Sequence, residues 1–139
     1  GMESEAPVGV LSSSLHAQGE YAESLMVELP ASRLNPRITE EMMKEGGHYP
    51  KMDGSRIFKL AVKRLPEVTH EALEKAGLSI DDVDMIFPHQ ANLRINQFYQ
   101  KSLDLPDEKM FNNIQKYGNT TAGTIPISLD EAFEQNLLK

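Results

Sequence analysis

The spacing of apolar residues changes character within one short stretch of the chain. Met85–Phe87 form an apolar run that is typical of a strand. Pro88 ends this run, because proline has no N–H to donate to a neighbouring strand. From Leu93 to Leu103 the apolar residues recur at helical spacing, and polar residues, His89 and Asn92 among them, lie between the two patterns. The pattern predicts a strand, a polar turn and a helix, the arrangement in which open α/β sheets place their reactive groups.

The same spacing predicts the other elements. Strands are expected at residues 7–17 and 25–29, and helices at residues 39–45, 55–76 and 122–138. Pro66 lies within the longest helix and is expected to kink it or split it in two. Residues 111–117 fit a short helix and an extended segment equally well. Gly118 opens a turn that reaches Thr121, because glycine tolerates a positive φ.

Residues 31–54 are predicted to form a long excursion, because prolines and glycines interrupt them repeatedly. Such an excursion is a lid, a binding loop or an ordinary surface insertion, and the sequence does not choose between these. Helices that alternate with apolar strands favour an α/β sheet. The chain ends on a helix, where a doubly wound sheet returns to a strand, so we expect closing strands to be missing.

Composition and charge narrow the class of protein. The 139 residues allow one domain, and 40% hydrophobic with 25% charged residues is ordinary for a globular chain. A net charge of −7 argues against nucleic acid as a partner. No apolar run approaches the roughly 20 residues of a membrane helix and no signal peptide is visible, so a cytoplasmic protein is expected. Gly1, ahead of Met2, is expected to be a remnant of an expression tag.

Few side chains qualify for chemistry. The chain has no cysteine, which excludes disulfides and a thiol nucleophile. The scattered His16, His48 and His70 lack the spacing of metal ligands, so no metal site is expected. His89 can exchange protons or donate a hydrogen bond, although by itself a structural histidine is the simpler interpretation. Asn119 by itself is most simply a turn asparagine.

Three separated strings resemble one family, the β-ketoacyl-acyl carrier protein synthases III. PHQANLRI at residues 88–95 resembles the histidine motif of that family, and KYGNTTAGTIPISLDEA at residues 116–132 resembles its asparagine motif. MDGSRIFKLAV at residues 52–62 is similar to a third family block. The resemblance implies an α/β fold, the C-terminal half of a thiolase-like protein. Residues 1–139 would form a single domain, with helices and a mixed five-stranded-type sheet whose last strands are missing.

The resemblance implies a decarboxylative condensation. An acyl group moves from coenzyme A to a cysteine, malonyl-acyl carrier protein loses carbon dioxide, and the resulting carbanion attacks the acyl-cysteine. The implied substrates are coenzyme A and phosphopantetheine thioesters, with no separate cofactor. The implied partners are acyl carrier protein, acyl-CoA and a second copy in a full-length homodimer. The cysteine belongs to the family's N-terminal half, which this chain is expected to lack, so the chain alone is expected to be inactive.

His89 and Asn119 match the catalytic positions of the family. Decarboxylation builds negative charge on the thioester oxygen, and each donor aimed at that oxygen lowers the barrier by roughly 3 kcal/mol. Asn119 can give only an amide N–H and never acts as a base. His89 can give one N–H if its other ring nitrogen is held, and it can also support a thiolate supplied by the missing half.

Two further groups of residues match binding positions of the family. Contacts with coenzyme A or pantetheine are implied for Asn92, Gly54 and Phe58. Ser55 stands where relatives often have asparagine, which shortens one polar arm. Docking of the carrier protein is implied for Lys59, Arg94 and Lys101. Because the carrier and this chain are both acidic, docking requires a local positive patch.

Two other functions stay open at this stage. One is a related acyl-CoA condensing enzyme of polyketide or olefin synthesis, which needs the same histidine and asparagine. The other is a non-catalytic module that binds thioesters or another subunit. Dependence of the complete enzyme on carrier protein or on coenzyme A distinguishes the first, and the length of the native reading frame distinguishes the second.

Overall fold

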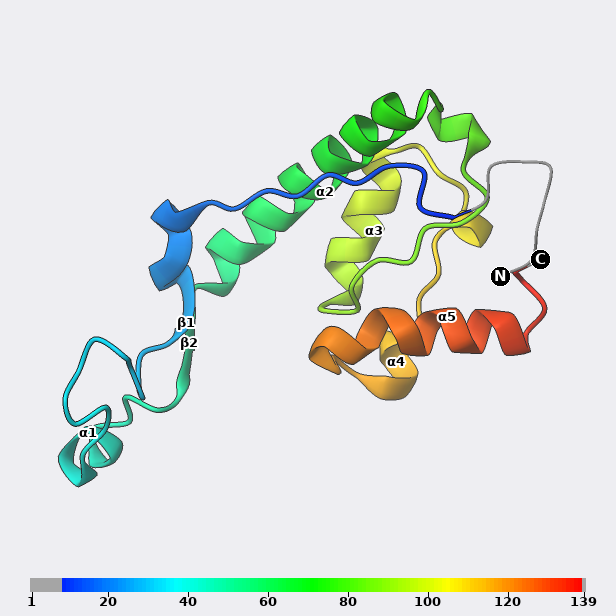
Figure 1. The fold of residues 1–139 in the computed structure, drawn as a ribbon. Coiled ribbons are helices and arrows are strands. Elements are labelled where there is room, and N and C mark those ends of the chain that lie inside the picture. The colour runs from blue at the N-terminus through cyan, green and yellow to red at the C-terminus, as the bar shows by residue number, and fades with distance from the viewer. Residues whose placement is uncertain (1–8, 139) are drawn as a thin grey trace. The chain divides into compact units, whose positions relative to one another are not determined.

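A computed structural model describes residues 9–138, which divide into two compact units (Figure 1). One unit comprises residues 16–61, and the other comprises residues 9–15 together with residues 62–138. The predicted tag residue Gly1 lies outside the described residues.

A two-stranded antiparallel sheet organises the unit of residues 16–61. After a 3-10 helix at Gly19–Ser24, strand β1 (Leu25–Val27) pairs with strand β2 (Pro50–Met52). Leu25 lies opposite Met52, and Val27 lies opposite Pro50. The strand predicted at residues 25–29 is confirmed in its first three residues, whereas β2 falls inside the predicted excursion.

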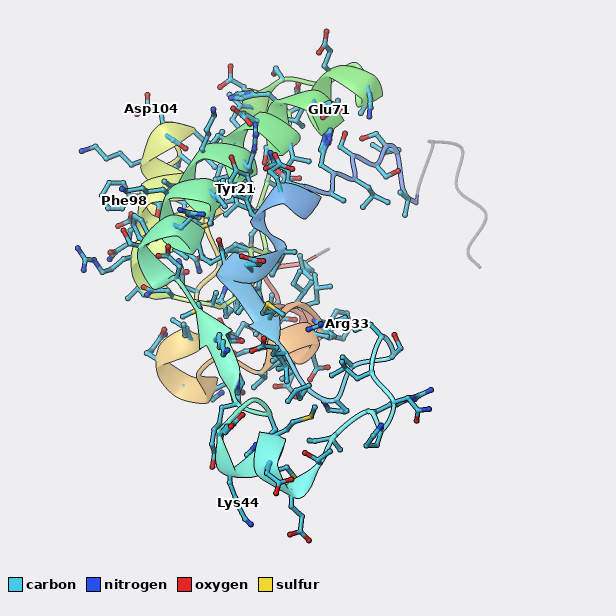
Figure 2. The ribbon with its side chains drawn as sticks, turned by 90° about the vertical axis from the view of Figure 1, so that its left-hand side faces the viewer. Tyr21, Arg33, Lys44, Glu71, Phe98 and Asp104 are labelled. Atoms are coloured by element: carbon cyan, nitrogen blue, oxygen red, sulfur yellow. The ribbon has the colours of Figure 1, made fainter. Side chains whose placement is uncertain are left out.

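Helix α1 (Glu40–Lys44) lies in the connection between β1 and β2, and Figure 2 shows its last residue, Lys44, extending away from it. Thr39 starts the helix as predicted, because its hydroxyl accepts a hydrogen bond from the Met42 N–H at 3.2 Å. The connection closes on itself where the Leu29 N–H donates to the Gly47 carbonyl at 3.0 Å. The buried Leu29 side chain occupies the space that a Cβ at Gly47 would need.

Helix α2 (Gly54–Ala76) is the longest element, and it runs through Pro66 without interruption. Asp53 caps its start, since Oδ1 accepts from the Arg56 N–H at 3.0 Å. Gly77, with a φ of 69°, follows the last residue of the helix and ends it. A division into two helices at Pro66 is wrong, because a proline removes only its own N–H donor and the adjacent turns keep their hydrogen bonds.

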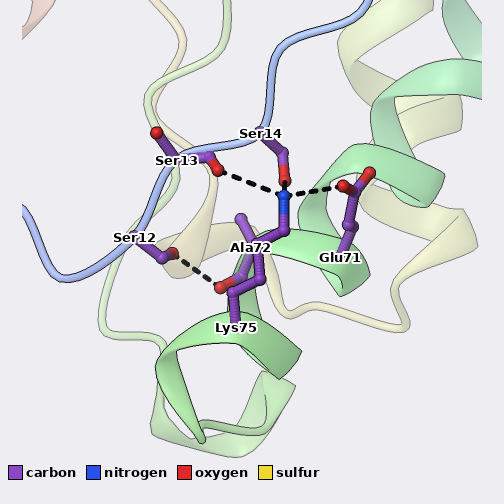
Figure 3. A network of polar contacts seen from close by, with 6 residues as sticks. All are labelled: Ser12, Ser13, Ser14, Glu71, Ala72 and Lys75. Carbon is purple, nitrogen blue, oxygen red and sulfur yellow. Dashed lines mark hydrogen bonds and ion pairs between the residues drawn. The ribbon is translucent and has the colours of Figure 1, made fainter.

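Residues 9–15 run extended beside the second half of α2 (Figure 3). Ser12 Oγ donates to the Ala72 carbonyl at 2.6 Å, and Lys75 Nζ donates to Ser14 Oγ at 2.9 Å. The strand predicted at residues 7–17 is therefore an extended segment that pairs with no strand in the described part, and its residues 7 and 8 lie outside that part. An alternating sequence fits an extended backbone, but a strand also needs a partner for its N–H and C=O groups.

The strand predicted at Met85–Phe87 is reduced to one parallel bridge between Ile86 and Met110. The Ile86 N–H donates to the Lys109 carbonyl at 2.8 Å, and the Phe111 N–H donates to the Ile86 carbonyl at 3.0 Å. Within residues 9–138, the sheet content is thus β1, β2 and this bridge. This small sheet content is consistent with a partial C-terminal half, and the described residues form no five-stranded sheet.

Helix α3 (Leu93–Ser102) supplies the core of this second unit. Tyr99, Leu103 and Met110 are buried together, against half-buried apolar residues of the neighbouring segments. Burial raises the pKa of the Tyr99 phenol, whose oxygen lies 2.5 Å from the Thr69 hydroxyl of α2. The helix predicted at this place is confirmed, with Leu103 as its C-cap.

Two short helices complete the unit. Helix α4 (Ile114–Tyr117) decides the ambiguous segment in favour of a helix. Helix α5 (Thr124–Glu134) follows a 3-10 turn at Thr121–Gly123, so the helix predicted at residues 122–138 is shorter at both ends. Asn136, with a φ of 56°, cannot continue an α-helix, and this limits α5 at its C-terminal end.

Candidate active site

The turn that carries the predicted catalytic histidine is fixed by Gln90. This side chain is 1% exposed and makes four hydrogen bonds to backbone groups. Its Nε2 donates to the carbonyls of Pro88 and Phe111 at 3.0 and 3.1 Å. Its Oε1 accepts from the N–H groups of Asn113 and Ile114, both at 3.2 Å. Gln90 therefore joins the turn both to the bridge segment and to the start of α4.

His89 is an exposed side chain with one ring nitrogen engaged. Its Nδ1 lies 2.6 Å from the hydroxyl of Thr124, the first residue of α5. Thr124 is 3% exposed, and its hydroxyl also lies 3.0 Å from the Thr121 carbonyl. Because Nδ1 is taken up by this contact, Nε2 is the ring nitrogen that a ligand can meet.

Asn119 is oriented by the backbone two residues further on. The Thr121 N–H donates to Asn119 Oδ1 at 2.8 Å. A backbone N–H can only donate, so the amide turns Oδ1 toward it and keeps Nδ2 as a donor for a ligand. Gly118, just before, has φ 68° and ψ −163°, a conformation almost restricted to glycine. Thr121 has a φ of 53°, which is rare for a β-branched residue.

A short series of contacts joins the two predicted catalytic residues. It runs from Asn119 Oδ1 to the Thr121 N–H, from the Thr121 carbonyl to Thr124 Oγ1, and from Thr124 Oγ1 to His89 Nδ1. Two residues from different sequence motifs therefore belong to one connected group. The atoms that this group leaves over, His89 Nε2 and Asn119 Nδ2, are the ones that can donate to a substrate oxygen.

Polar contacts also hold α4 to α5, on either side of the turn that carries Asn119. The buried Asn113 donates from Nδ2 to Glu131 Oε2 at 2.8 Å, and its Oδ1 lies 3.1 Å from the Ser128 hydroxyl. Lys116 Nζ donates to Glu131 Oε1 at 2.8 Å. The hydrogen bonds from Lys116 and then Asn113 lower the pKa of Glu131, and the bond to Glu131 raises the pKa of Lys116.

Three other predicted site residues lie on or beside α3. Asn92 is the N-cap, and its Oδ1 accepts from the Arg94 N–H at 2.9 Å. Its Nδ2 is then the group that can contact a thioester ligand. Arg94 and Lys101 are exposed and stand seven residues apart, which places them on the same side of the helix. Both cations can therefore meet one partner surface.

The remaining predicted site residues, Gly54, Phe58 and Lys59, lie in the first turns of α2, within the unit of residues 16–61. Gly54 and Lys59 are exposed, and Phe58 is half-buried. A Cβ on Gly54 would lie 3.8 Å from Met52 Cε, which is an ordinary contact. Packing therefore does not by itself require a glycine at this position.

Sequence patterns did not identify the residues that orient His89 and Asn119. Gln90 stood out only as part of a motif, and Thr124 had no predicted role. A usable signal is the recurrence of Thr124, Ser128 and Ala132 every four residues, since these small residues form the buried face of α5. Two hydroxyl groups on a buried helix face need hydrogen-bond partners, and such partners connect elements.

The described residues offer no metal centre: none of them form a group of three or more His, Asp or Glu side chains that could hold an ion. In the same range, no helix combines the length and the apolar character that a membrane span requires.

Known proteins match this chain along its length. Residues 73–139 match the family described as 3-oxoacyl-[acyl-carrier-protein (ACP)] synthase III C terminal. The beta-ketoacyl-[acyl-carrier-protein] synthase III of Roseiflexus castenholzii is 44% identical over 136 residues, which cover 98% of this chain and 41% of that protein. The chain is thus similar over nearly its whole length to β-ketoacyl-acyl carrier protein synthases III, and its residues 73–139 match the C-terminal part of that family.

Further synthases III are also similar to this chain. The protein of Fusobacterium nucleatum is 41% identical over 99% of the chain. The crystal structure of synthase III from Aquifex aeolicus matches with a TM-score of 0.81 and 37% identity, over 99% of this chain and 39% of that one. The fold is thus thiolase-like and corresponds to part of a synthase III. The chain spans well under half the length of the relatives it matches.

A synthase of another pathway also shares the fold. The priming β-ketosynthase of the R1128 polyketide biosynthetic pathway matches with a TM-score of 0.63 and 30% identity, over 82% of this chain. Both values of structural agreement, TM-score and coverage, are lower than for the synthase III of Aquifex aeolicus.

Proposed function

We propose that this chain contributes His89 and Asn119 to an active site that condenses acyl-CoA with malonyl-acyl carrier protein in fatty-acid biosynthesis. The observation that supports this most is the connected group of contacts around Thr121 and Thr124. The Thr121 N–H donates to Asn119 Oδ1, and the Thr124 hydroxyl contacts His89 Nδ1. His89 Nε2 and Asn119 Nδ2 are thereby the side-chain nitrogens that remain to donate to one substrate oxygen.

The reaction requires donors of this kind. Loss of carbon dioxide breaks the bond between the malonyl Cα and its carboxylate carbon. The electron pair passes into the thioester, and negative charge develops on the carbonyl oxygen of the enolate. The enolate carbon then attacks an acyl-cysteine thioester and displaces the thiolate. The chain has no cysteine, so that nucleophile must come from outside these 139 residues.

The two proposed donors differ in how they depend on protonation. Asn119 does not titrate, so its Nδ2 is a donor at every pH at which the protein is folded. His89 is a donor at Nε2 only in the tautomer, or the charged form, that carries a hydrogen there. Each aimed donor stabilises the developing charge by about 3 kcal/mol in comparable sites.

We also propose two binding roles. Asn92 contacts the pantetheine arm of a coenzyme A or carrier-protein thioester through Nδ2. Separately, Gly54 and Phe58, in the unit of residues 16–61, are proposed as contacts for such a thioester. The exposed cations Lys59, Arg94 and Lys101 attract the acidic carrier protein.

The complete enzyme that contains this chain tests the proposal. It receives acyl-CoA together with malonyl-acyl carrier protein or with malonyl-CoA, and the products are analysed by mass spectrometry. A β-ketoacyl carrier protein, two carbons longer than the primer, supports the proposal. Product from malonyl-CoA alone supports a related condensing enzyme, an alternative that the match to the polyketide ketosynthase keeps open. Thioester binding without any product contradicts the enzymatic proposal and favours a binding module.

A further inference from the structure

The Thr124 hydroxyl stands between two groups that can accept its only hydrogen. His89 Nδ1 lies 2.6 Å from Thr124 Oγ1, and the Thr121 carbonyl oxygen lies 3.0 Å from it. If the hydrogen points to Nδ1, the neutral ring carries its own hydrogen on Nε2. If the hydrogen points to the Thr121 carbonyl, Nδ1 must donate to Oγ1, and Nε2 becomes an acceptor. The position of one hydroxyl hydrogen is thus tied to the tautomer of His89.

We propose that Thr124 is a positioning residue that holds neutral His89 as the Nε2–H tautomer by donating its hydroxyl hydrogen to Nδ1. The distance of 2.6 Å between Oγ1 and Nδ1 favours this direction, because it lies within the usual range of a hydroxyl donor and below that of an N–H donor. This inference rests on the proposed function, in which Nε2 must be a donor. The opposite tautomer would turn a lone pair toward the enolate oxygen and repel it.

The surroundings of Thr124 limit the position of its hydroxyl and the partners available to it. The side chain is 3% exposed, so solvent does not compete for the hydroxyl. As the first residue of α5, Thr124 is fixed by the helix, and its carbonyl accepts from the Ser128 hydroxyl at 2.7 Å. The Thr121 carbonyl also accepts a hydrogen bond from the Thr124 backbone N–H. The hydroxyl therefore has a fixed position and only two partners among the described residues.

Nitrogen NMR of the histidine ring tests the proposal on the chain itself. The chain is labelled with ¹⁵N in its histidines and studied at alkaline pH, where the imidazole is neutral. The expected spectrum of His89 has the hydrogen on Nε2 and a hydrogen-bonded lone pair on Nδ1. Thr124→Ser keeps the hydroxyl and is expected to keep this spectrum. Thr124→Val has the same shape without the hydroxyl, and its two ring-nitrogen shifts are expected to move toward each other as the tautomers interconvert.

A control in the same turn separates the tautomer from general packing. Thr120 Oγ1 is buried without a hydrogen-bond partner in the described part of the chain, so Thr120→Val removes a hydroxyl that holds nothing. Its His89 spectrum is expected to equal that of the wild type. An Nδ1–H tautomer in the wild type, or a Thr124→Val spectrum identical to that of the wild type, would overturn the proposal.

The kinetic consequence is measured in the complete enzyme. Thr124→Val is expected to lower kcat for malonyl-thioester decarboxylation at least about tenfold with little change in KM, and Thr124→Ser to restore it. An unchanged kcat would overturn the positioning role. A failure of the proposed function gives a different pattern of results. In that case His89→Ala leaves decarboxylation intact, while the His89 ring spectrum of the chain is still the expected one.

Discussion

At the scale of single residues, Gln90 supplies hydrogen bonds that a longer sheet would otherwise provide. The parallel bridge at Ile86 ends just before the polar turn. The Gln90 amide then donates to the Phe111 carbonyl and accepts from the N–H groups of Asn113 and Ile114. A buried glutamine with all these bonds satisfied fixes one local arrangement, because any other arrangement leaves buried polar groups without partners.

Removal of the Gln90 amide is expected to destabilise the chain strongly. In Gln90→Ala, the N–H groups of the buried Asn113 and the half-buried Ile114 lose their acceptor, and the free energy of unfolding should fall by about 3 kcal/mol. Gln97→Ala, at an exposed position of α3, is the matched control and should change it by less than about 0.5 kcal/mol. Urea unfolding followed by circular dichroism measures both. Equal losses in the two variants would contradict the role given to Gln90.

The backbone conformation of Gly118 gives a second prediction at this scale. Gly118→Ala should lower the free energy of unfolding by about 1–3 kcal/mol, because a side chain opposes its φ of 68° and ψ of −163°. Gly19→Ala is the control: an added Cβ meets no heavy atom within 4 Å at either glycine, and only Gly118 has a positive φ. Thermal unfolding compares the two variants. A loss at Gly19 as large as at Gly118 would show that strain is not the cause.

The sequence predicts the reactive residues of the site better than their supports. His89 and Asn119 can be chosen from sequence because the chemistry lies in the side chain itself and the motif lies in consecutive residues. The roles of Gln90 and Thr124 consist of bonds to segments far away in the chain. Such bonds depend on packing, and no local pattern contains them.

At the scale of elements, α4 and α5 are held together by one carboxylate that accepts hydrogen bonds from two donors. Glu131 on α5 accepts from Asn113 at the start of α4 and from Lys116 near its end. The turn between the helices carries Asn119, so this carboxylate also limits the movement of the proposed catalytic amide. The arrangement depends on Glu131 being ionised, because a protonated carboxyl loses acceptor capacity and the attraction to Lys116.

The contribution of Glu131 should depend on pH in a defined direction. Its hydrogen bonds hold the pKa in the folded protein below the usual value of 4.5. Stability from this group is therefore fully present above that value and is lost as the pH falls through the lowered folded pKa. The difference in unfolding free energy between wild type and Glu131→Gln should shrink over this acidic range. Glu134→Gln, on the exposed side of α5, is the control. A difference in unfolding free energy between wild type and Glu131→Gln that keeps the same size at all pH values would contradict the account.

Helices were predicted from the sequence more reliably than strands. The bounds of α2 and α3 follow from local spacing and caps. By contrast, residues 9–17 pair with no strand in the described part, and residues 85–87 form only a single bridge, at Ile86. The apolar spacing of α5 does not identify its buried face. Its apolar residues Ile125, Leu129 and Phe133 are exposed by 40% or more, and the small residues are buried. Periodicity finds a stripe, but packing decides which stripe is covered.

At the scale of the whole molecule, charge is the property that bears most on a partner. The chain has a net charge of −7, so an acidic carrier protein is repelled by the sum of the charges. The proposed docking of a carrier protein then depends on local cations, and Lys59, Arg94 and Lys101 are all exposed. The sequence identified these positions by resemblance alone, because charge on one residue does not reveal its partner.

Reversal of these charges should weaken binding of the carrier protein in a salt-dependent way. In the complete enzyme, Lys59→Glu and Arg94→Glu are each expected to raise the Kd about fivefold at low ionic strength, and less at high salt. Lys44→Glu makes the same change of net charge on α1 and should have a smaller effect. Isothermal titration calorimetry at two salt concentrations measures all three. Unchanged affinity of both variants at low salt would remove the docking role.

The central claim is that His89 and Asn119 stabilise the enolate formed from a malonyl thioester. The most direct measurement is the rate of carbon dioxide release from malonyl-acyl carrier protein by the complete enzyme, with wild type, His89→Ala and Asn119→Asp. Asn119→Asp keeps the shape of the side chain and replaces the donor by an acceptor. Each variant is expected to lower kcat by about 100-fold to 1,000-fold with little change in KM. Release of carbon dioxide at the wild-type rate by either variant would contradict the claim.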